Sequence, residues 1–224
     1  MFERRFKNRE EAGKRLAKEL VAYRGKATIV FAIPRGGVVT AYEIAKVLDA
    51  PLDIIIPRKI GAPGNQELAI GAVTEDGTTI LNTRLVTMLG ISDAYIESEK
   101  AKQIEEIKRR VKTYRGEHSP KDFEGKIVIL VDDGIATGAT VRAAIHSLRK
   151  GNPSFIIVAI PVGPPDTIQE LKQEVDKLIC LITYEPFFAI GQFYADFSQV
   201  PDRDVITLLK KTKFEWDHSK KISL

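Results

Sequence analysis

Short runs of apolar residues alternate with amphipathic stretches along most of the chain. The runs are rich in β-branched residues and apolar on both faces, which is typical of strands in a covered parallel sheet. The stretches between them repeat apolar residues every three or four positions, which predicts helices. We expect strands over residues 27–33, 52–56, 126–131, 155–162 and 178–183, and helices over residues 8–24, 38–48, 92–114, 140–148, 165–175 and 201–209.

This order of elements predicts an α/β fold, a doubly wound parallel sheet with helices on both faces. Two segments depart from the alternation. One is rich in glycine and proline, which predicts an exposed flexible loop followed by a short β excursion. The other is rich in aromatic residues but too interrupted for a strand, which predicts a small flap, or hood, over one sheet edge. We expect a single domain over residues 1–209, with the loop at about 58–77 and the flap at about 183–200, and a basic C-terminal tail over 210–224.

The composition adds limits on the class of protein. The 224 residues are 44% hydrophobic and 29% charged, which is typical of a globular protein and excludes fibres and disordered chains. A net charge of +4 is too weak over this length to indicate a nucleic-acid surface. The single cysteine, Cys180, excludes a disulfide framework and is interpreted as a buried small side chain. With no signal-like or membrane-spanning run, we expect a cytoplasmic protein that does not contact membranes.

The strongest candidate for chemistry follows the strand at 126–131. Ligands of parallel sheets bind beyond the carboxyl ends of the strands. At this point Asp132 and Asp133 can accept hydrogen bonds from sugar hydroxyls or help to hold a divalent cation. The next residues can present backbone N–H groups and two hydroxyls to a phosphate at the start of a helix. This predicted phosphate loop consists of Ala136, Thr137, Gly138, Ala139 and Thr140.

Acids followed by a glycine-rich turn also occur in other α/β proteins, including magnesium-binding signalling domains. The order of acids, glycines and hydroxyls between a buried strand and a helix favours a phosphate-binding function. The segment resembles the phosphoribosyl diphosphate signature of type I phosphoribosyltransferases. The resemblance implies that Asp132 and Asp133 contact the ribose 2- and 3-hydroxyls and bind Mg²⁺ directly, through water or through those hydroxyls. It also implies that residues 136–140 bind the 5-phosphate.

The same resemblance gives a role to two further loops. After the first predicted strand the family has a diphosphate-binding turn, which implies ligand contacts from Arg35, Gly36 and Gly37. A glycine pair at a strand end lets the backbone approach a ligand closely. Arg58 and Lys59 match a basic pair found after the next strand in several branches of the family. Their charge can compensate the leaving diphosphate, and the predicted loop can close to exclude water.

The resemblance does not identify the acceptor substrate. Salvage enzymes for 6-oxopurines carry an acid where this sequence has Ala136, and adenine and orotate enzymes often carry a further lysine where it has Ala62. Neither group is supported. Over about residues 1–210 the sequence is most similar to a branch of predicted phosphoribosyltransferases whose substrate is not assigned.

These observations predict a Mg²⁺-dependent phosphoribosyltransferase. It would move the phosphoribosyl group from phosphoribosyl diphosphate to an unidentified nitrogen base and release diphosphate, with Arg35, Lys59, Asp132 and Asp133 as catalytic residues. One alternative is a non-catalytic regulator that senses phosphoribosyl diphosphate or a nucleotide and binds nucleic acid or a protein. Another is a Mg²⁺-binding domain that is phosphorylated on an aspartate. Because the basic residues form no dense stripe, nucleic acid is not an expected partner, while a homodimer remains open.

Other candidate side chains have simpler interpretations. His118, His146 and His218 share no metal-ligand spacing, so no zinc site is expected. Glu67 could be a general acid or base, but it is interpreted as a solvated carboxylate. Most aromatic residues of the flap are expected to form its own core, and one or two to reach a planar ligand. The residues concerned are Phe187, Phe188, Phe193, Tyr194 and Phe197.

Overall fold

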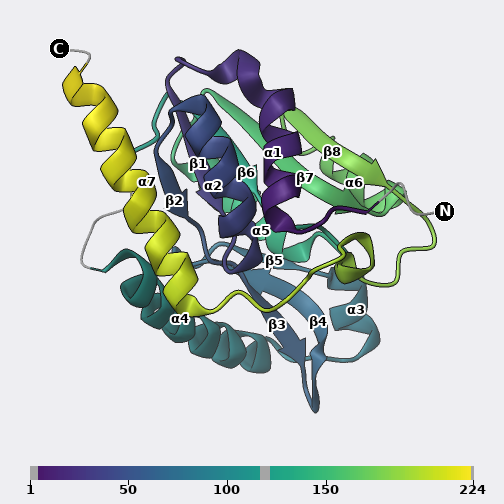
Figure 1. The fold of residues 1–224 in the computed structure, drawn as a ribbon. Helices are drawn as coiled ribbons and strands as arrows, with labels where there is room; N and C mark the ends of the chain where they lie inside the picture. Colours follow the sequence, from purple (N-terminus) through teal and green to yellow (C-terminus); the bar gives the residue numbers. More distant parts are fainter. Residues whose placement is uncertain (1–4, 117–121, 223–224) are drawn as a thin grey trace.

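A parallel sheet of five strands forms the centre of the fold, in the order β2-β1-β6-β7-β8 (Figure 1). The structure, a computed structural model, describes residues 5–116 and 122–222, and side chains as far as residue 212. The strand order reverses between β1 and β6, which confirms the predicted doubly wound sheet. The strands are β1 (Thr28–Ala32), β2 (Leu52–Ile54), β6 (Ile127–Val131), β7 (Phe155–Gly163) and β8 (Lys177–Thr183).

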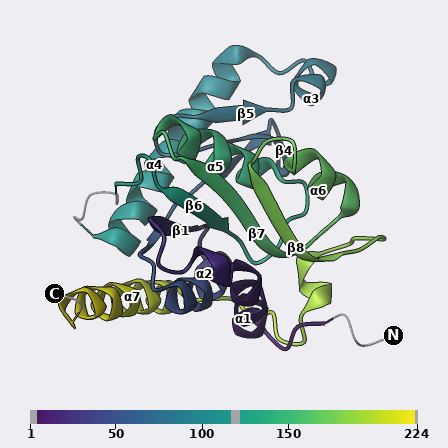
Figure 2. The same cartoon turned by 90° about the horizontal axis from the view of Figure 1, so that it is seen from above.

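Helices cover both faces of this sheet (Figures 1 and 2). One group of helices lies on one face and a second group on the other, and a long helix, α4, packs beside a second, smaller sheet. The first face carries α1 (Arg9–Leu20), α2 (Gly36–Leu48) and α7 (Asp202–Ile222). The second carries α5 (Ala139–Lys150) and α6 (Pro165–Leu171), and α4 runs over Asp93–Arg115.

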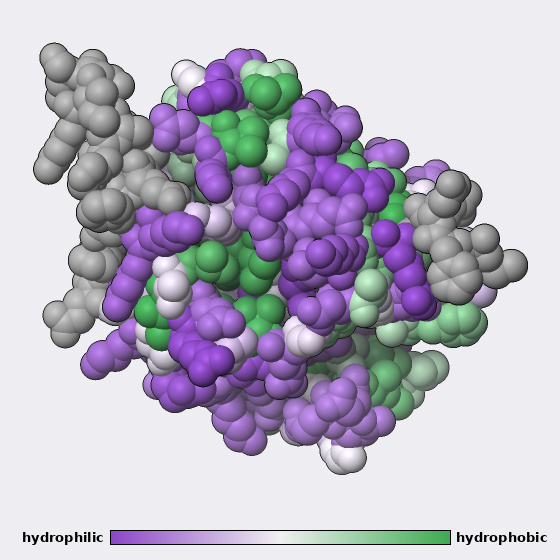
Figure 3. All heavy atoms as spheres, in the orientation of Figure 1, coloured by the Kyte–Doolittle hydropathy of each residue, from purple (hydrophilic) through white to green (hydrophobic). Residues whose placement is uncertain are grey.

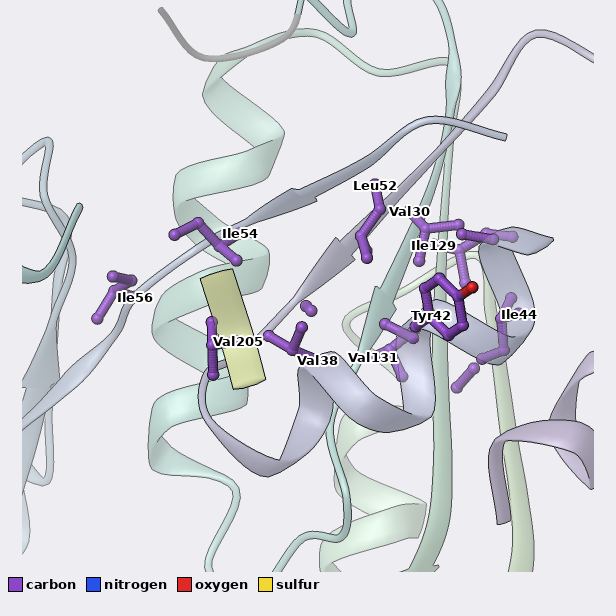
Figure 4. Close-up of a cluster of buried hydrophobic side chains, with 14 of the residues drawn as sticks. Val30, Val38, Tyr42, Ile44, Leu52, Ile54, Ile56, Ile129, Val131 and Val205 are labelled. Carbon is purple, nitrogen blue, oxygen red and sulfur yellow. The ribbon is translucent and has the colours of Figure 1, made fainter. Parts of the chain in front are cut away.

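The central strands are buried on both faces, as their uniformly apolar sequences predict. In β6, Ile129 and Val131 belong to the core under α1, α2 and α7, whereas Val128 and Leu130 belong to the core under α5 and α6. Successive side chains of a strand point to opposite faces, so one strand supplies both cores. Figure 4 shows the first core, in which Val205 of α7 lies among residues of α2 and the strands.

Helix ends follow the sequence signals closely. The Asn8 side chain accepts a hydrogen bond from the N–H of Glu11 at 2.9 Å, which caps α1 as predicted. The hydroxyl of Ser92 accepts one from the N–H of Tyr95 at 3.3 Å at the start of α4. These local caps fix where each helix begins, and they place Arg9 in the first turn of α1.

The segment at 58–77, predicted as a flexible loop followed by a short β excursion, is mostly part of an antiparallel sheet, so its β structure is more extensive than predicted. Its strands are β3 (Arg58–Ala62), β4 (Asn65–Val73) and β5 (Thr79–Leu81), in that order. Ile60 and Ile70 are fully buried in the same cluster as Ile107 of α4. Glycines and prolines correctly mark the turns, but pairing with β5 and packing on α4 are non-local and leave no signal within the segment. Only the hairpin tip, residues 63–68, is exposed along its whole length.

Asp76 holds the turn between β4 and β5 to helix α5. Its carboxylate accepts hydrogen bonds from the hydroxyls of Thr74 and Thr78, both at 2.6 Å, and from the ammonium of Lys150 at 2.9 Å. Burial alone would raise the pKa of Asp76, but these hydrogen bonds outweigh it and hold the pKa well below its ordinary value. The carboxylate therefore stabilises the folded state in its ionised form.

We expect Asp76→Asn to destabilise the fold at pH 7 by about 1 kcal/mol, since the amide replaces charge-assisted hydrogen bonds with weaker ones. Because the folded pKa lies below the unfolded one, this contribution is full above pH ~4 and is lost as the pH falls further. Thermal unfolding of both proteins at pH 7 and pH 3 checks it, with the exposed Asp166→Asn as control. An equal difference in Tm at both pH values would contradict this role.

The C-terminal segment also differs from the prediction. A helix was expected at 201–209 and a loose basic tail from 210, but α7 continues to Ile222. Thr212, only 4% exposed, is still packed against the rest of the fold. Lysine has a high helix propensity, so a lysine-rich stretch continues a helix that packing has already started. The side chains of the later tail residues, His218 among them, lie outside the described residues.

Cys180 is less buried than its apolar neighbours predict. It lies in β8, where its thiol donates a hydrogen bond to the carbonyl oxygen of Ile182 at 3.2 Å. Burial raises the pKa of the thiol to about 12, so it is a weak nucleophile at neutral pH.

Hydrophilic side chains cover most of the face drawn in Figure 3, and the hydrophobic ones form small patches. Within the described ranges, no helix combines the length and the apolar character that crossing a membrane requires.

Candidate active site

The register of the central sheet brings two strand-end loops together. Ala32 of β1 pairs with Val131 of β6, and the N–H of Ile33 donates to the carbonyl oxygen of Val131 at 2.9 Å. The chain leaves both strands at the same level, so the turn 34–37 and the acidic loop 132–134 lie side by side. This is the reversal point of the sheet, where ligands of doubly wound folds bind.

Gly36 shows how closely the two loops approach. A Cβ atom at this position would collide with the Asp133 carboxylate and would lie 2.6 Å from Nε of Arg9. At Gly37, a Cβ atom would lie 3.0 Å from the backbone of both Val131 and Asp132. The glycine pair is therefore required by the contact between the loops, and the two predicted ligand-binding segments form one site.

Asp132 and Asp133 stand together at the end of β6. Asp132 Oδ1 accepts a hydrogen bond from the N–H of Asp133 at 2.8 Å. Burial raises the pKa of Asp132 well above its ordinary value, and the neighbouring Asp133 carboxylate raises it further. A ligand that brings hydroxyl donors or positive charge would offset this unfavourable environment. The acid pair is thus suited to a sugar or a cation.

Arg9 and Tyr194 hold Asp133, and the sequence does not indicate either contact. Nε of Arg9 lies 2.6 Å from Asp133 Oδ2, and the two side chains are only 11% and 13% exposed. The hydroxyl of Tyr194 donates to the backbone carbonyl oxygen of Asp133 at 2.6 Å. Burial, and after it the charge of Asp133, raises the pKa of Tyr194, so the hydroxyl stays protonated and able to donate. In the sequence Arg9 shows only as the residue after a helix cap.

The predicted phosphate loop opens α5 as expected. Gly138 adopts φ +75°, a left-handed conformation that favours glycine, and stands at the N-terminus of α5 without a side-chain cap. Ala136 and Thr137 are exposed, and the Thr167 hydroxyl donates to the Ala136 carbonyl oxygen at 2.9 Å. The first N–H groups of a helix have no intrahelical partner and carry partial positive charge, so this turn can accept an anion.

Arg35 belongs to the same group of loops, but its side chain turns toward the start of α7. Its Nη1 lies 3.6 Å from Asp202 Oδ1, and the same oxygen accepts a hydrogen bond from the Tyr114 hydroxyl at 2.7 Å. Burial, together with the bond to Asp202, raises the pKa of Tyr114 to about 12. The backbone of the turn thus faces the acids, while the Arg35 guanidinium is paired with the carboxylate of Asp202.

The contacts of Arg58 and Lys59, the basic pair on β3, do not include Asp132 or Asp133. Arg58 donates from Nε to Gln103 Oε1 at 2.5 Å and lies 4.0 Å from Glu106, so it faces α4. Lys59 pairs with Ala72 of β4, and its exposed side chain has no partner among the described residues. Adjacent strand residues face opposite ways, which explains the split. Roles for Arg58 and Lys59 at the site stay predictions.

Most aromatic residues of the flap pack into a small core, as predicted, but the flap shares this core with residues outside it, such as Phe6, Val162 and Ile182. The ring of Phe193 lies 5.3 Å from that of Phe187 and 5.8 Å from that of Tyr184, measured between centroids. Tyr194 stacks on Phe197 at 5.0 Å. Phe188 is the exception, at 84% exposed. A ligand contact of the flap aromatics stays a prediction.

Comparison with known proteins identifies the family to which the chain belongs. Residues 5–198 match the phosphoribosyl transferase domain, a range that begins before α1 and takes in both strand-end loops and the flap. The chain belongs to the phosphoribosyl transferase family. The sequence resemblance is thereby confirmed over almost the whole of the predicted domain.

Members of the phosphoribosyl transferase family with similar sequences occur in two strains of Mycobacterium tuberculosis. Each is named "Putative phosphoribosyl transferase" and is 40% identical over 206 residues, which cover 92% of this chain and 46% of the relative. The chain thus spans about half the length of these relatives. The crystal structure of TT1426 from Thermus thermophilus is 38% identical, with a TM-score of 0.78, and the match covers 92% of this chain and 98% of that one.

The acid pair of this family member fits Mg²⁺, the metal that the type I resemblance implies. Mg²⁺ in proteins keeps several waters and is held by one or two carboxylates together with substrate phosphates. Asp132 and Asp133 supply two such carboxylates. Over the described ranges, no group of three or more His, Cys, Asp or Glu residues could hold a metal ion by itself. The residues therefore suit an ion that shares its ligands with a substrate.

His146, the histidine whose side chain the structure describes, does not add to this site. His146 is exposed on α5 and lies 3.6 Å from Glu174, away from the acid pair's loop. His118 lies outside the described residues, and so does the side chain of His218. Glu67 is exposed at the tip of the β3–β4 hairpin, which agrees with its interpretation as a solvated carboxylate.

Proposed function

We propose that the protein transfers the phosphoribosyl group of phosphoribosyl diphosphate to a small nitrogen base and releases diphosphate. The observation that supports this most strongly is the contact between the turn 34–37 and the acid pair, with the phosphate loop directly after it. Three ligand groups would meet there: a diphosphate, a ribose and a 5-phosphate. The family membership supports the reaction class, and the acceptor base stays open.

In this proposal the acids and the loops divide the work. Asp132 and Asp133 accept hydrogen bonds from the ribose hydroxyls and offset the positive charge that develops on the ring during transfer. The N–H groups at the start of α5 hold the 5-phosphate, so that remote binding energy positions the reacting carbon. The backbone of Gly36 and Gly37 faces the diphosphate. Bound Mg²⁺ would supply charge compensation for the diphosphate oxygens.

A calorimetric and activity screen tests the proposal. Phosphoribosyl diphosphate is titrated with and without Mg²⁺, and diphosphate release is then followed with a panel of purines, pyrimidines and related nitrogen heterocycles. We expect binding that depends on Mg²⁺ and release with at least one base. Absence of diphosphate release across the panel, in the presence of Mg²⁺, would sink the transferase activity. Absence of phosphoribosyl diphosphate binding would sink the substrate as well.

Lys59→Ala separates a transferase from a sensor. Because Lys59 is exposed on β3 and forms no hydrogen bond or ion pair with a described residue, its removal should leave the fold intact. In a transferase it compensates the leaving diphosphate, so turnover should fall by about 100-fold, within the range for one electrostatic contact in a transition state. Phosphoribosyl diphosphate affinity should fall much less. Steady-state kinetics and calorimetry measure the two, with Lys172→Ala on the surface as control. Equal losses in both would point to a sensor.

A further inference from the structure

One side chain joins the acid pair to the flap. Arg9, in the first turn of α1, places Nε 2.6 Å from Asp133 Oδ2. Its Nη1 donates to the carbonyl oxygen of Ser198 at 2.8 Å, and its Cζ lies 3.8 Å from the centre of the Phe197 ring. A guanidinium is planar, so it can donate along its edge while its face stacks on an aromatic ring. Arg9 uses both properties here.

The backbone on either side keeps this arrangement in register. The N–H of Phe6 donates to the Phe193 carbonyl oxygen at 2.8 Å, and the N–H of Ala195 donates to the Phe6 carbonyl oxygen at 2.8 Å. The N–H of Asp196 donates to the carbonyl oxygen of Lys7 at 2.9 Å. The flap therefore runs alongside the residues just before Arg9, and Phe6 is fully buried against it.

The third neighbour of Arg9 is the glycine turn. A Cβ atom on Gly36 would meet both Arg9 Nε and Asp133 Oδ2, so the ion pair lies directly over the proposed diphosphate-binding backbone. The turn, the acids and the flap are all far from one another in sequence. Arg9 is 124 residues from Asp133 in the chain. One guanidinium thus contacts the acid pair and the flap, and it lies next to the glycine turn.

We propose that Arg9 is a positioning residue of the proposed site: it fixes the carboxylate of Asp133 for the ribose hydroxyls and fastens residues 197 and 198 of the flap beside it. The inference rests on the proposed function for its ribose part. Its flap part stands on the contacts alone.

The test compares Arg9→Ala with Arg15→Ala. Arg15 lies on the same helix and also stacks on an aromatic ring, with Cζ 4.8 Å from the centre of Phe6, but it does not contact the acids. Calorimetry with phosphoribosyl diphosphate and Mg²⁺ should show wild-type affinity for Arg15→Ala and a loss of about 10- to 100-fold for Arg9→Ala, as for one charge-assisted hydrogen bond. Millimolar guanidinium chloride should restore part of the affinity of Arg9→Ala alone.

Hydrogen exchange without ligand supplies the second measurement. In Arg9→Ala the amides of residues 193–200 should exchange faster than in Arg15→Ala, while those of α5 stay unchanged. Wild-type affinity in Arg9→Ala, or a loss that guanidinium does not restore and that accompanies faster exchange throughout the fold, would overturn the inference. If the wild type itself binds no phosphoribosyl diphosphate, the proposed function fails together with the ribose part, and unchanged exchange in the flap would then refute the flap part too.

Discussion

Replacing both acids, Asp132→Asn with Asp133→Asn, is expected to abolish measurable binding of phosphoribosyl diphosphate. Each acid would contribute at least one charge-assisted hydrogen bond to the ribose, worth about 1.5 to 3 kcal/mol. Loss of two such bonds weakens binding by roughly 100- to 10,000-fold, before any loss of a shared Mg²⁺ ion is counted. Turnover should fall with it, since the variant cannot offset charge on the ribose ring.

The two changes are expected to have opposite effects on stability, because Asp133 is the ion-pair partner of Arg9 whereas Asp132 is not. Burial and the Asp133 charge raise the pKa of Asp132, so its ionised form is disfavoured in the folded protein and costs stability above that pKa. A neutral amide of the same shape removes this cost. Asp133→Asn, in contrast, leaves the mostly buried Arg9 guanidinium without its charged partner, which lowers Tm. We therefore expect Asp132→Asn alone to keep or slightly raise Tm at pH 7, and the double variant to have a lower Tm than Asp132→Asn, together with lost binding. Asp166→Asn, an exposed acid at the start of α6, is the control and should keep full affinity. Retained binding in the double variant would refute the role of the acids.

Gly36→Ala is expected to have the next largest effect, with binding of phosphoribosyl diphosphate weakened by about 100-fold, the loss expected when the backbone and the acid are both displaced. The added methyl group meets the Asp133 carboxylate and Arg9 Nε, both of them side-chain atoms. Side chains can turn away at modest energetic cost, so the fold should survive. The carboxylate, however, would leave its position. Calorimetry measures the loss of binding, and thermal unfolding of the same sample measures whether the fold is retained.

Gly37→Ala is the informative contrast. Its methyl group would lie 3.0 Å from the Asp132 Cα and 3.0 Å from the Val131 carbonyl oxygen, which are backbone atoms of β6 and its loop. Backbone cannot turn aside, so this variant should lose several degrees in Tm, as overpacking does. If Gly36→Ala lost stability and Gly37→Ala did not, the proposed arrangement of the two loops would be wrong.

Most of the fold was predictable because its signals are local. The strands of the main sheet are apolar on both faces, and the helices carry caps such as Asn8 and Ser92. The positions of the two glycine-containing loops followed from the same patterns. Parallel strands end at a common edge, so a loop after β1 and a loop after β6 could be expected at one site once the strands were placed.

The β3–β4–β5 sheet could not be predicted in this way. Within residues 58–77, glycine and proline give a turn signal, whereas the pairing of Gly71 with Leu81 and the burial of Ile60 depend on partners elsewhere. The direction of a side chain is equally non-local. Arg58 and Lys59 are neighbours in sequence, yet one faces α4 and the other is exposed, because a strand alternates its faces.

Local sequence patterns were enough to predict the α/β class, the order of the main strands and helices, and the acids, glycines and hydroxyls at the strand ends. These depend on periodicity and on backbone preferences that act over a few residues. The folded structure was needed to show that Arg9 meets Asp133, that Tyr194 and the flap close beside them, and that Arg35 turns to Asp202. Those contacts join residues far apart in the chain, and their geometry exists only once the helices have packed on the sheet.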